Sequence, residues 1–309
     1  MTSASFTLTE KQMALLKRLE LAHLAYFLKY KHPVTGLTLD KSAPHSAASI
    51  AATGFGLTAH AILAERGVIS RRQAASYVLS VLRTMWGAAQ GPSVEGTSGH
   101  WGCYYHFIDP ATGLRACDWK FWPELRKWFN EEKPAPPRID VELSTLDTAL
   151  FMLGVLSVRN YFHRNTKAEK EVRALADALY RRVEWDKFLT DGNLLRSGWK
   201  PELVEDKKQG FLEGVYQGFT EAFLLYLVAI GSPTHGIPAK SWLAQLANVK
   251  LEEKYGERFA QDKDSPQFIV QFLNAWFDFR HILDAWNRSR HLTWFENARS
   301  RGLNASAPY

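Results

Sequence analysis

Two kinds of helical segment alternate along this chain, one apolar nearly all round and one amphipathic. A helix that is apolar all round must be buried, whereas an amphipathic helix covers a core with one face and meets water with the other. The apolar segments are predicted at 46–66, 144–162, 220–231 and 266–285. The amphipathic segments are predicted at 9–31, 70–88, 167–183, 238–247 and 292–301. Concentric layers of helical hairpins produce this alternation, so we predict an all-α fold, a toroid-type barrel of paired helices.

An α-solenoid would also alternate in this way, but the sequence contains no repeat of fixed period, which favours the closed double ring. Six hairpins contain about twelve helices and the periodicity predicts about nine, so the ring is expected to be incomplete at its C-terminal end. Residues 1–309 are predicted to form one such domain with its C-terminal helices missing.

The chain of 309 residues carries a formal charge of +6. Its Lys and Arg residues are dispersed and no nucleic-acid-binding motif accompanies them, so no nucleic acid partner is predicted. No apolar run reaches the roughly 18 residues that a membrane span needs, and no membrane insertion is predicted. No export signal is visible either. We therefore expect a cytoplasmic protein as the sequence stands, or a periplasmic one if a signal was removed.

Cysteine usage is sparse, with Cys103 and Cys117 on either side of a predicted hairpin. A disulfide is one interpretation, and two free thiols are the favoured one. Metal-ligand spacings, phosphate-binding loops and nucleophile motifs are absent from the sequence, so neither a metal nor a cofactor is predicted. The hairpin itself is predicted from YYHFIDPATGLRAC, in which Asp109-Pro110 and Thr112-Gly113 indicate the turn. A Trp-rich segment, DWKFWPELRKWF, follows it.

Acidic residues recur where the apolar helices are expected to begin, at Asp40, Glu142, Asp147 and Glu221. Each one alone is explained by the preference of carboxylates for helix N-termini. Asp147 and Glu221, however, are followed by apolar runs, where an ionised group is costly without partners. If the inner helices run the same way, these carboxylates share one rim, and a shared pocket is where acid and base roles separate.

Aromatic and hydrogen-bonding residues occur in the loops that lead to this rim. The candidates are Tyr105, His106, Trp199, Tyr216 and His235. Because a pyranose ring has one apolar face, aromatic side chains beside carboxylates are typical of sugar-binding sites. His106 could equally be a structural histidine. Carboxylates with aromatic rings and no cofactor motif favour glycoside chemistry.

Several collinear segments resemble a known family. They are IAATGFGLTAHAILAERGVIS (50–70), YYHFIDPATGLR (104–115), ELSTLDTALFMLGVLSVRNYF (142–162), GWKPE (198–202), FTEAFLLYLVAIGSPTHGIP (219–238) and AWFDFR (275–280). Together they resemble the glucoamylase-like family, which includes endo-β-1,2-glucanases and the barrel domain of cyclic β-1,2-glucan synthases.

The resemblance implies a glycoside hydrolase with a glycan cleft at one end of an (α/α)6 barrel, acting on an oligo- or polysaccharide with β-linkages, above all β-1,2-glucan. It implies Glu221 as the general acid, with Asp147 and Glu142 as further catalytic carboxylates. Other residues are expected to bind substrate. They are Asp40, Phe55, Tyr105, His106, Trp199, Tyr216, His235, Trp276 and Asp278.

The chain departs from the family pattern at three places. The Trp-rich segment at 118–139 is not typical, Asn274 stands where a His is usual, and family members continue beyond the position of Tyr309. Two other interpretations therefore stay open. One is a truncated or inactive relative that binds glycan without hydrolysing it, and the other is a helical scaffold.

Overall fold

The computed structural model describes residues 7–132, 136–204, 210–254, 256–261 and 268–305. Helices dominate this part of the chain, but it also contains eight short strands. The all-α prediction is therefore correct only in a coarser form, because the protein is mainly helical with small sheets. No helix among the described residues combines the length and apolarity that crossing a membrane requires.

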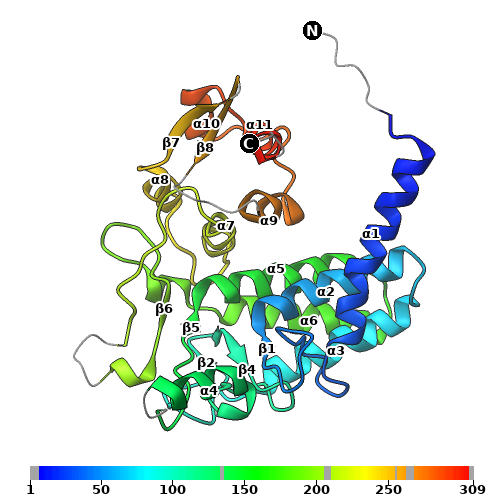
Figure 1. Ribbon diagram of the computed structural model, residues 1–309, viewed down its shortest axis with the longest axis vertical. Coiled ribbons are helices and arrows are strands. Elements are labelled where there is room, and N and C mark those ends of the chain that lie inside the picture. Colours follow the sequence, from blue (N-terminus) through cyan, green and yellow to red (C-terminus); the bar gives the residue numbers. More distant parts are fainter. Residues whose placement is uncertain (1–6, 133–135, 205–209, 255, 262–267, 306–309) are drawn as a thin grey trace.

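Four helices form an inner set whose members contact one another in turn (Figure 1). They are α2 (Ile50–Glu65), α5 (Thr145–Tyr161), α7 (Phe223–Ile230) and α9 (Phe268–Trp276). The ring of Phe55 on α2 lies 4.7 Å from that of Trp276 on α9, so aromatic side chains connect the last member to the first. The predicted apolar segments thus supply the inner helices.

A second set packs against the outside of the inner helices. It consists of α1 (Glu10–Lys29), α3 (Arg71–Gly87), α6 (Lys167–Arg182), α8 (Lys240–Leu246) and α11 (Trp294–Ala305). Capping boxes begin two of them, formed by Thr9 with Gln12 and by Ser70 with Gln73, as their sequence pattern indicates. The start of α1 extends away from the rest of the molecule (Figure 1), and Leu24 is the one buried residue of this helix among the described residues.

The predicted helix over 266–285 is wrong in its second half. Pro266 lies outside the described residues, α9 ends at Trp276, and α10 (Ala285–Arg290) begins separately. Asp278 accepts a hydrogen bond from the backbone N–H of Arg280, and Asp284 caps α10 by accepting one from Asn287. Asp side chains that bond to nearby backbone amides compete with helix continuation, which explains the break.

Two further elements differ from the sequence-based prediction. A hairpin of β7 (Lys250–Lys254) and β8 (Glu257–Gln261) occupies a stretch with no predicted element. Helix α4 (Pro123–Glu132) forms within the Trp-rich segment, after the short 3-10 turn Trp119–Phe121. Neither segment has a long apolar pattern, because both lie at the periphery and bury only a few side chains, among them Phe259 and Trp119.

Short strands tie the beginnings of the inner helices together. Strand β1 (Ala48–Ser49) leads into α2 and pairs with β4 (Phe107–Ile108). A four-stranded sheet has the order β2-β3-β5-β6, in which β5 leads into α5. Its strands are β2 (Gly99–His100), β3 (Cys103–Tyr105), β5 (Leu143–Ser144) and β6 (Gly198–Trp199). The sheets therefore hold α2 and α5 with their N-termini at the same end.

The predicted turn of the 104–117 hairpin is confirmed. The N–H of Gly113 donates to the carbonyl of Asp109 at 2.8 Å, and Ile108 bridges to Arg115. Strand β3, however, pairs with β2 and β5 instead of folding back on this turn. Cys103 and Cys117 are both free thiols, as the favoured interpretation had it.

Close packing of α2 against α5 depends on two glycines. A Cβ at Gly54 would lie 2.4 Å from the carbonyl oxygen of Leu150, and a Cβ at Gly154 would lie 2.1 Å from that of Gly54. Real Cβ atoms do not approach backbone so closely, so both positions require glycine. The two helices can therefore run in direct backbone contact, which brings the side chains of their first turns together.

Candidate active site

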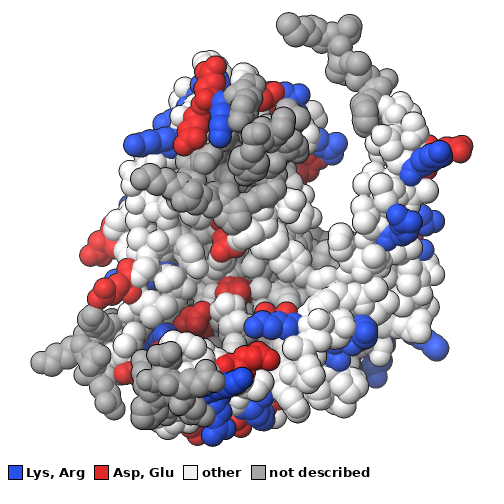
Figure 2. Space-filling view, viewed as in Figure 1, with Lys and Arg blue, Asp and Glu red and all other residues white. Residues whose placement is uncertain are grey.

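A cavity of about 640 Å³ lies where α2, α5 and α7 begin. Acidic side chains are visible in the hollowed middle of the corresponding face (Figure 2). The walls of the cavity combine acidic, aromatic and aliphatic side chains, a composition that suits a polar ligand with apolar faces. The residues that define it are Ala51, Ala52, Phe55, His106, Glu142, Ser144, Leu146, Asp147, Leu150, Ser197, Lys200, Leu212, Tyr216, Glu221, Phe268 and Phe272.

His106 is held from both sides by backbone hydrogen bonds. Its N–H donates to the carbonyl of Glu142 at 2.9 Å, and its carbonyl accepts from the N–H of Ile50 at 3.1 Å. The residue thus joins the start of α2 to the strand that leads into α5. Its ring stacks on that of Phe107, with 3.9 Å between the centroids. These contacts fix the imidazole in the cavity wall.

The His106 ring bridges two carboxylates. Its Nδ1 lies 2.8 Å from Oε1 of Glu142, and its Nε2 lies 3.5 Å from Oδ1 of Asp147. Asp147 also contacts the hydroxyl of Ser144, the residue that caps α5. The Asp147 side chain is 16% exposed, so its charge is largely removed from water.

Burial and the shared histidine separate the acidities of these groups. Burial lowers the pKa of His106, but the hydrogen bond with Glu142 and the charge of Asp147 outweigh it and raise the pKa overall. Burial acts to raise the pKa of Glu142, yet its bond with His106 brings that pKa below the ordinary value. Burial raises the pKa of Asp147, and His106 offsets only part of this effect.

Helix α7 begins at Phe223 and not at residue 220 as predicted, so Glu221 lies in the turn that precedes the helix. Burial raises the pKa of Glu221, and the negative charge of Asp147 raises it further. Burial also raises the pKa of Tyr216, as do the charges of Asp147 and Glu221. Tyr216 therefore keeps its proton and can donate a hydrogen bond into the cavity.

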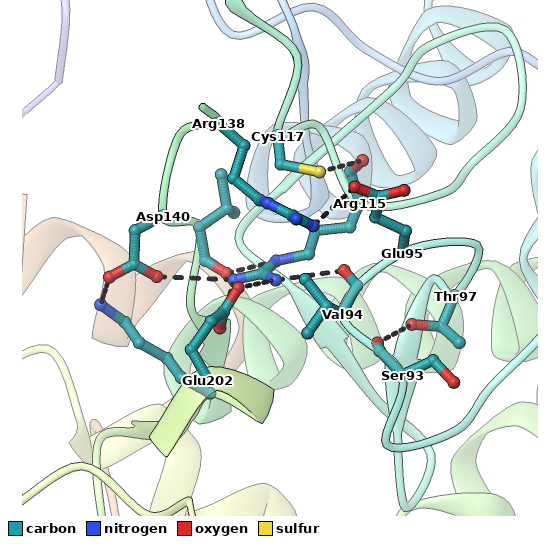
Figure 3. Close-up of polar contacts among 11 residues, drawn as sticks. Ser93, Val94, Glu95, Thr97, Arg115, Cys117, Arg138, Asp140 and Glu202 are labelled. Carbon is teal, nitrogen blue, oxygen red and sulfur yellow. Dashed lines mark hydrogen bonds and ion pairs between the residues drawn. The ribbon is translucent and has the colours of Figure 1, made fainter. Parts of the chain in front are cut away.

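A buried arginine supports the segment that precedes β5 and carries Glu142 (Figure 3). The Arg115 side chain is 0% exposed, and its Nε donates to the carbonyl of Val141 at 2.8 Å. Its Nη1 and Nη2 bind the carboxylate of Glu202 at 2.6 and 3.1 Å. Lys200, which lines the cavity, binds Asp140 at 2.6 Å. The Arg115–Glu202 and Lys200–Asp140 pairs thus connect the segment before Glu142 with the segment that follows β6.

The structure brings together six of the residues singled out in the sequence. Glu142, Asp147, Glu221, Phe55, His106 and Tyr216 all line the cavity. Three others lie next to residues of its wall but do not line it. Tyr105 is fully buried with its ring 4.7 Å from the Arg115 guanidinium, Trp199 is buried beside Trp101, and Trp276 donates to Thr58.

The remaining three predicted residues lie outside this cavity. Asp40 lines a neighbouring hollow. His235 follows the far end of α7, about 12 Å of helix from Glu221 at 1.5 Å per residue, and pairs with Asp186. Asp278 is exposed and pairs with Arg280. The resemblance implied that His235 and Asp278 line the cleft, but the length of α7 places His235 at its far end and Asp278 pairs locally with Arg280. Asp40 was expected there from its place before the second helix, and it lines the neighbouring hollow instead.

Sequence reasoning missed several wall residues, among them Ser144, Lys200 and Phe272. Ser144 was recognisable as the cap of an apolar helix with Asp147 three residues later. Lys200 lies in the GWKPE segment but was assigned no role, and Phe272 carries no local signal, since only the tertiary structure brings these elements to the cavity. Among the described residues, no group of three or more His, Cys, Asp or Glu side chains is arranged to hold a metal ion.

Comparison with known proteins agrees with this architecture. Residues 215–306, which include Tyr216, Glu221 and helices α7 to α11, match the family model described as "Putative glucoamylase". Over this part of its length the chain resembles the glucoamylase-like family. A curated relative from Parabacteroides distasonis, an exo β-1,2-glucooligosaccharide sophorohydrolase acting at the non-reducing end, is 24% identical over 264 residues. That alignment covers 84% of this chain and 32% of the relative, so the chain spans about a third of the relative's length.

Solved structures share the fold. A crystal structure from Bacteroides uniformis, described as a "putative glucoamylase", matches with a TM-score of 0.75 and 20% identity over 97% of this chain. The endo-β-1,2-glucanase of Chitinophaga pinensis, solved with sophorotriose and glucose, matches with a TM-score of 0.73 and 21% identity over 96% of it. In each case the chain spans 66% of the solved structure.

Proposed function

We propose that this protein is a glycoside hydrolase that cleaves a β-linked glucan in the acidic cavity. The observation that carries the proposal is the convergence of three carboxylates with separated acidities, Glu142, Asp147 and Glu221, in a cavity walled by aromatic rings. Glycosidases use a protonated carboxyl group and an ionised one on the two sides of the scissile bond. The helices that carry this cavity are proposed to belong to an (α/α)6 barrel.

The acidities suggest different roles for the carboxyl groups. Glu221, whose pKa is raised, would be the group that donates a proton to the leaving oxygen, directly or through a substrate hydroxyl. Glu142, whose pKa is lowered, would stay ionised and activate a water molecule. Asp147 would sustain the raised pKa of Glu221 through its charge and could position water or sugar. Phe55 and Tyr216 would contact the sugar rings.

The names of two similar proteins support β-1,2-glucan as the substrate. One is a sophorohydrolase for β-1,2-glucooligosaccharides, and the other is an endo-β-1,2-glucanase. The direct test incubates the purified protein with β-1,2-, β-1,3- and β-1,4-glucans and measures the release of reducing sugar. We expect release from the β-1,2-linked polymer above all. A folded protein that released nothing from any of the three would refute the proposal.

The pH profile provides an independent test of the assigned roles. The kcat/KM profile should be bell-shaped, falling at low pH as Glu142 gains a proton and at high pH as Glu221 loses one. Asp147→Asn removes a negative charge that raises the pKa of Glu221, so the alkaline limb should move to lower pH. Asp186→Asn, beside His235, is the matched control and should leave the limb in place. An alkaline limb that stays or moves upward in Asp147→Asn would contradict the assignment.

A further inference from the structure

A second hollow of about 350 Å³ lies beside the acidic cavity. One wall comes from the segment before β1, through Asp40, Ser46 and Ala47, and the other from the Trp-rich segment, through Trp122 and Leu125. This volume lies within the range of small-molecule sites. The Trp-rich segment is the part of the chain that the proposed reaction leaves without a role.

The two hollows share a wall of stacked rings. His106 lines the acidic cavity and stacks on Phe107. Trp122 lines the second hollow and also contacts Phe107, with the two rings edge-on and their centroids 4.9 Å apart. Phe107 therefore contacts one wall residue of each hollow.

The backbone and the charges also connect the two hollows. Ala47 lines the second hollow and Ala51 lines the acidic cavity, so at most about 14 Å of extended chain separates these walls. The charge of Asp40 acts on the His106 imidazole and helps to raise its pKa. A chain of a few linked pyranose rings is long enough to occupy both spaces.

The chemistry of the second hollow suits a sugar. Trp122 and Phe121 are half-buried rings that present apolar surface to the hollow. Within the described part of the chain, the carboxylate of Asp40 has no hydrogen-bond or ion-pair partner, so it can accept bonds from hydroxyl groups. The indole N–H of Trp122 already donates to the carbonyl of Ala116, which fixes the ring in place before any ligand binds.

We infer that the hollow between Asp40 and Trp122 is a second saccharide-binding site, which holds further sugar units of the glycan whose scissile bond lies in the acidic cavity. This inference rests on the proposed function. It assigns the atypical Trp-rich segment a role in selecting longer chains, since only these reach from Glu221 past Phe107 to Trp122.

The test measures binding instead of turnover. In a Glu221→Gln background, calorimetry with β-1,2-glucooligosaccharides of increasing length should show affinity that rises with length until both hollows are filled. Adding Trp122→Ala should weaken binding of the longer oligosaccharides roughly tenfold and leave the shortest ones unchanged, because a buried Trp contact is commonly worth about 1.4 kcal/mol or more. Trp128→Ala, on the adjoining helix α4, is the matched control, because Trp128 is 50% exposed and does not line the hollow.

A second variant covers the case in which Trp122→Ala does not fold. Leu125→Arg fills the hollow from an exposed position and should produce the same selective loss. Equal loss for short and long oligosaccharides, or no loss in either variant, would overturn the second site. Hydrolysis by the unmodified protein is scored separately. If the unmodified protein hydrolyses glucan but affinity does not change with oligosaccharide length, the second site alone is rejected. If the variants lose affinity only for long oligosaccharides but the unmodified protein hydrolyses nothing, the proposed hydrolase activity alone is rejected.

Discussion

Glu221→Gln should reduce glucan hydrolysis by roughly a thousandfold, in line with the usual contribution of a positioned acid, while the protein stays folded. The amide has nearly the same shape as the carboxyl group but cannot deliver a proton at neutral pH. Because the pKa of Glu221 is raised by burial and by Asp147, replacement by a neutral group should not lower stability. The measurements are initial rates of reducing-sugar release and the midpoint of thermal unfolding.

Glu171→Gln provides the matched control for this experiment. Glu171 lies on α6, pairs with Arg83 on the surface, and does not line the cavity. Its replacement should change neither rate nor unfolding midpoint appreciably, since exposed ion pairs contribute little. If Glu221→Gln kept a substantial part of the rate, a different group would have to donate the proton. Loss of activity together with loss of folding would mean that the residue is structural.

Gly54→Ala should destabilise the protein by about 3 kcal/mol, a large effect for one added methyl group. The new Cβ would meet the backbone of Leu150 and Phe151 at 2.4 and 2.6 Å. Neither atom belongs to a flexible side chain, so α2 and α5 would have to separate. This movement should also displace Phe55 from the cavity wall. Chemical denaturation followed by circular dichroism measures the change.

Gly87→Ala tests whether the loss is due to contact and not to glycine itself. Gly87 ends α3, and a Cβ there would meet nothing within 4 Å. This substitution should be neutral or stabilise by up to about 1 kcal/mol, since alanine is the better helix former. Similar unfolding free energies for the Gly54 and Gly87 variants would show that the α2–α5 approach is not as close as described.

The pattern of apolar and amphipathic segments predicted the inner and outer helices. A helix buried on all sides is apolar all round, whereas a helix buried on one side is apolar only on that side. It failed at the long segment after 266. There Asp278 and Asp284 bond to nearby backbone amides and end one helix before another begins. The hairpin of β7 and β8 was missed for a related reason, since a peripheral strand pair needs no apolar run.

The sequence alone determined which carboxylates stand at the beginnings of apolar helices, because Glu142, Asp147 and Glu221 can be placed by helix position without knowing any contact. The tertiary structure decided which of them share a site and with what acidity. His106 joins Glu142 to Asp147 only because β1 pairs with β4 and β3 with β5, and these pairings link residues far apart in the chain. His235 likewise lies outside the cavity, because it follows the far end of α7 and pairs with Asp186. Periodicity reports local burial, whereas pKa and proximity depend on distances that only the packed chain defines.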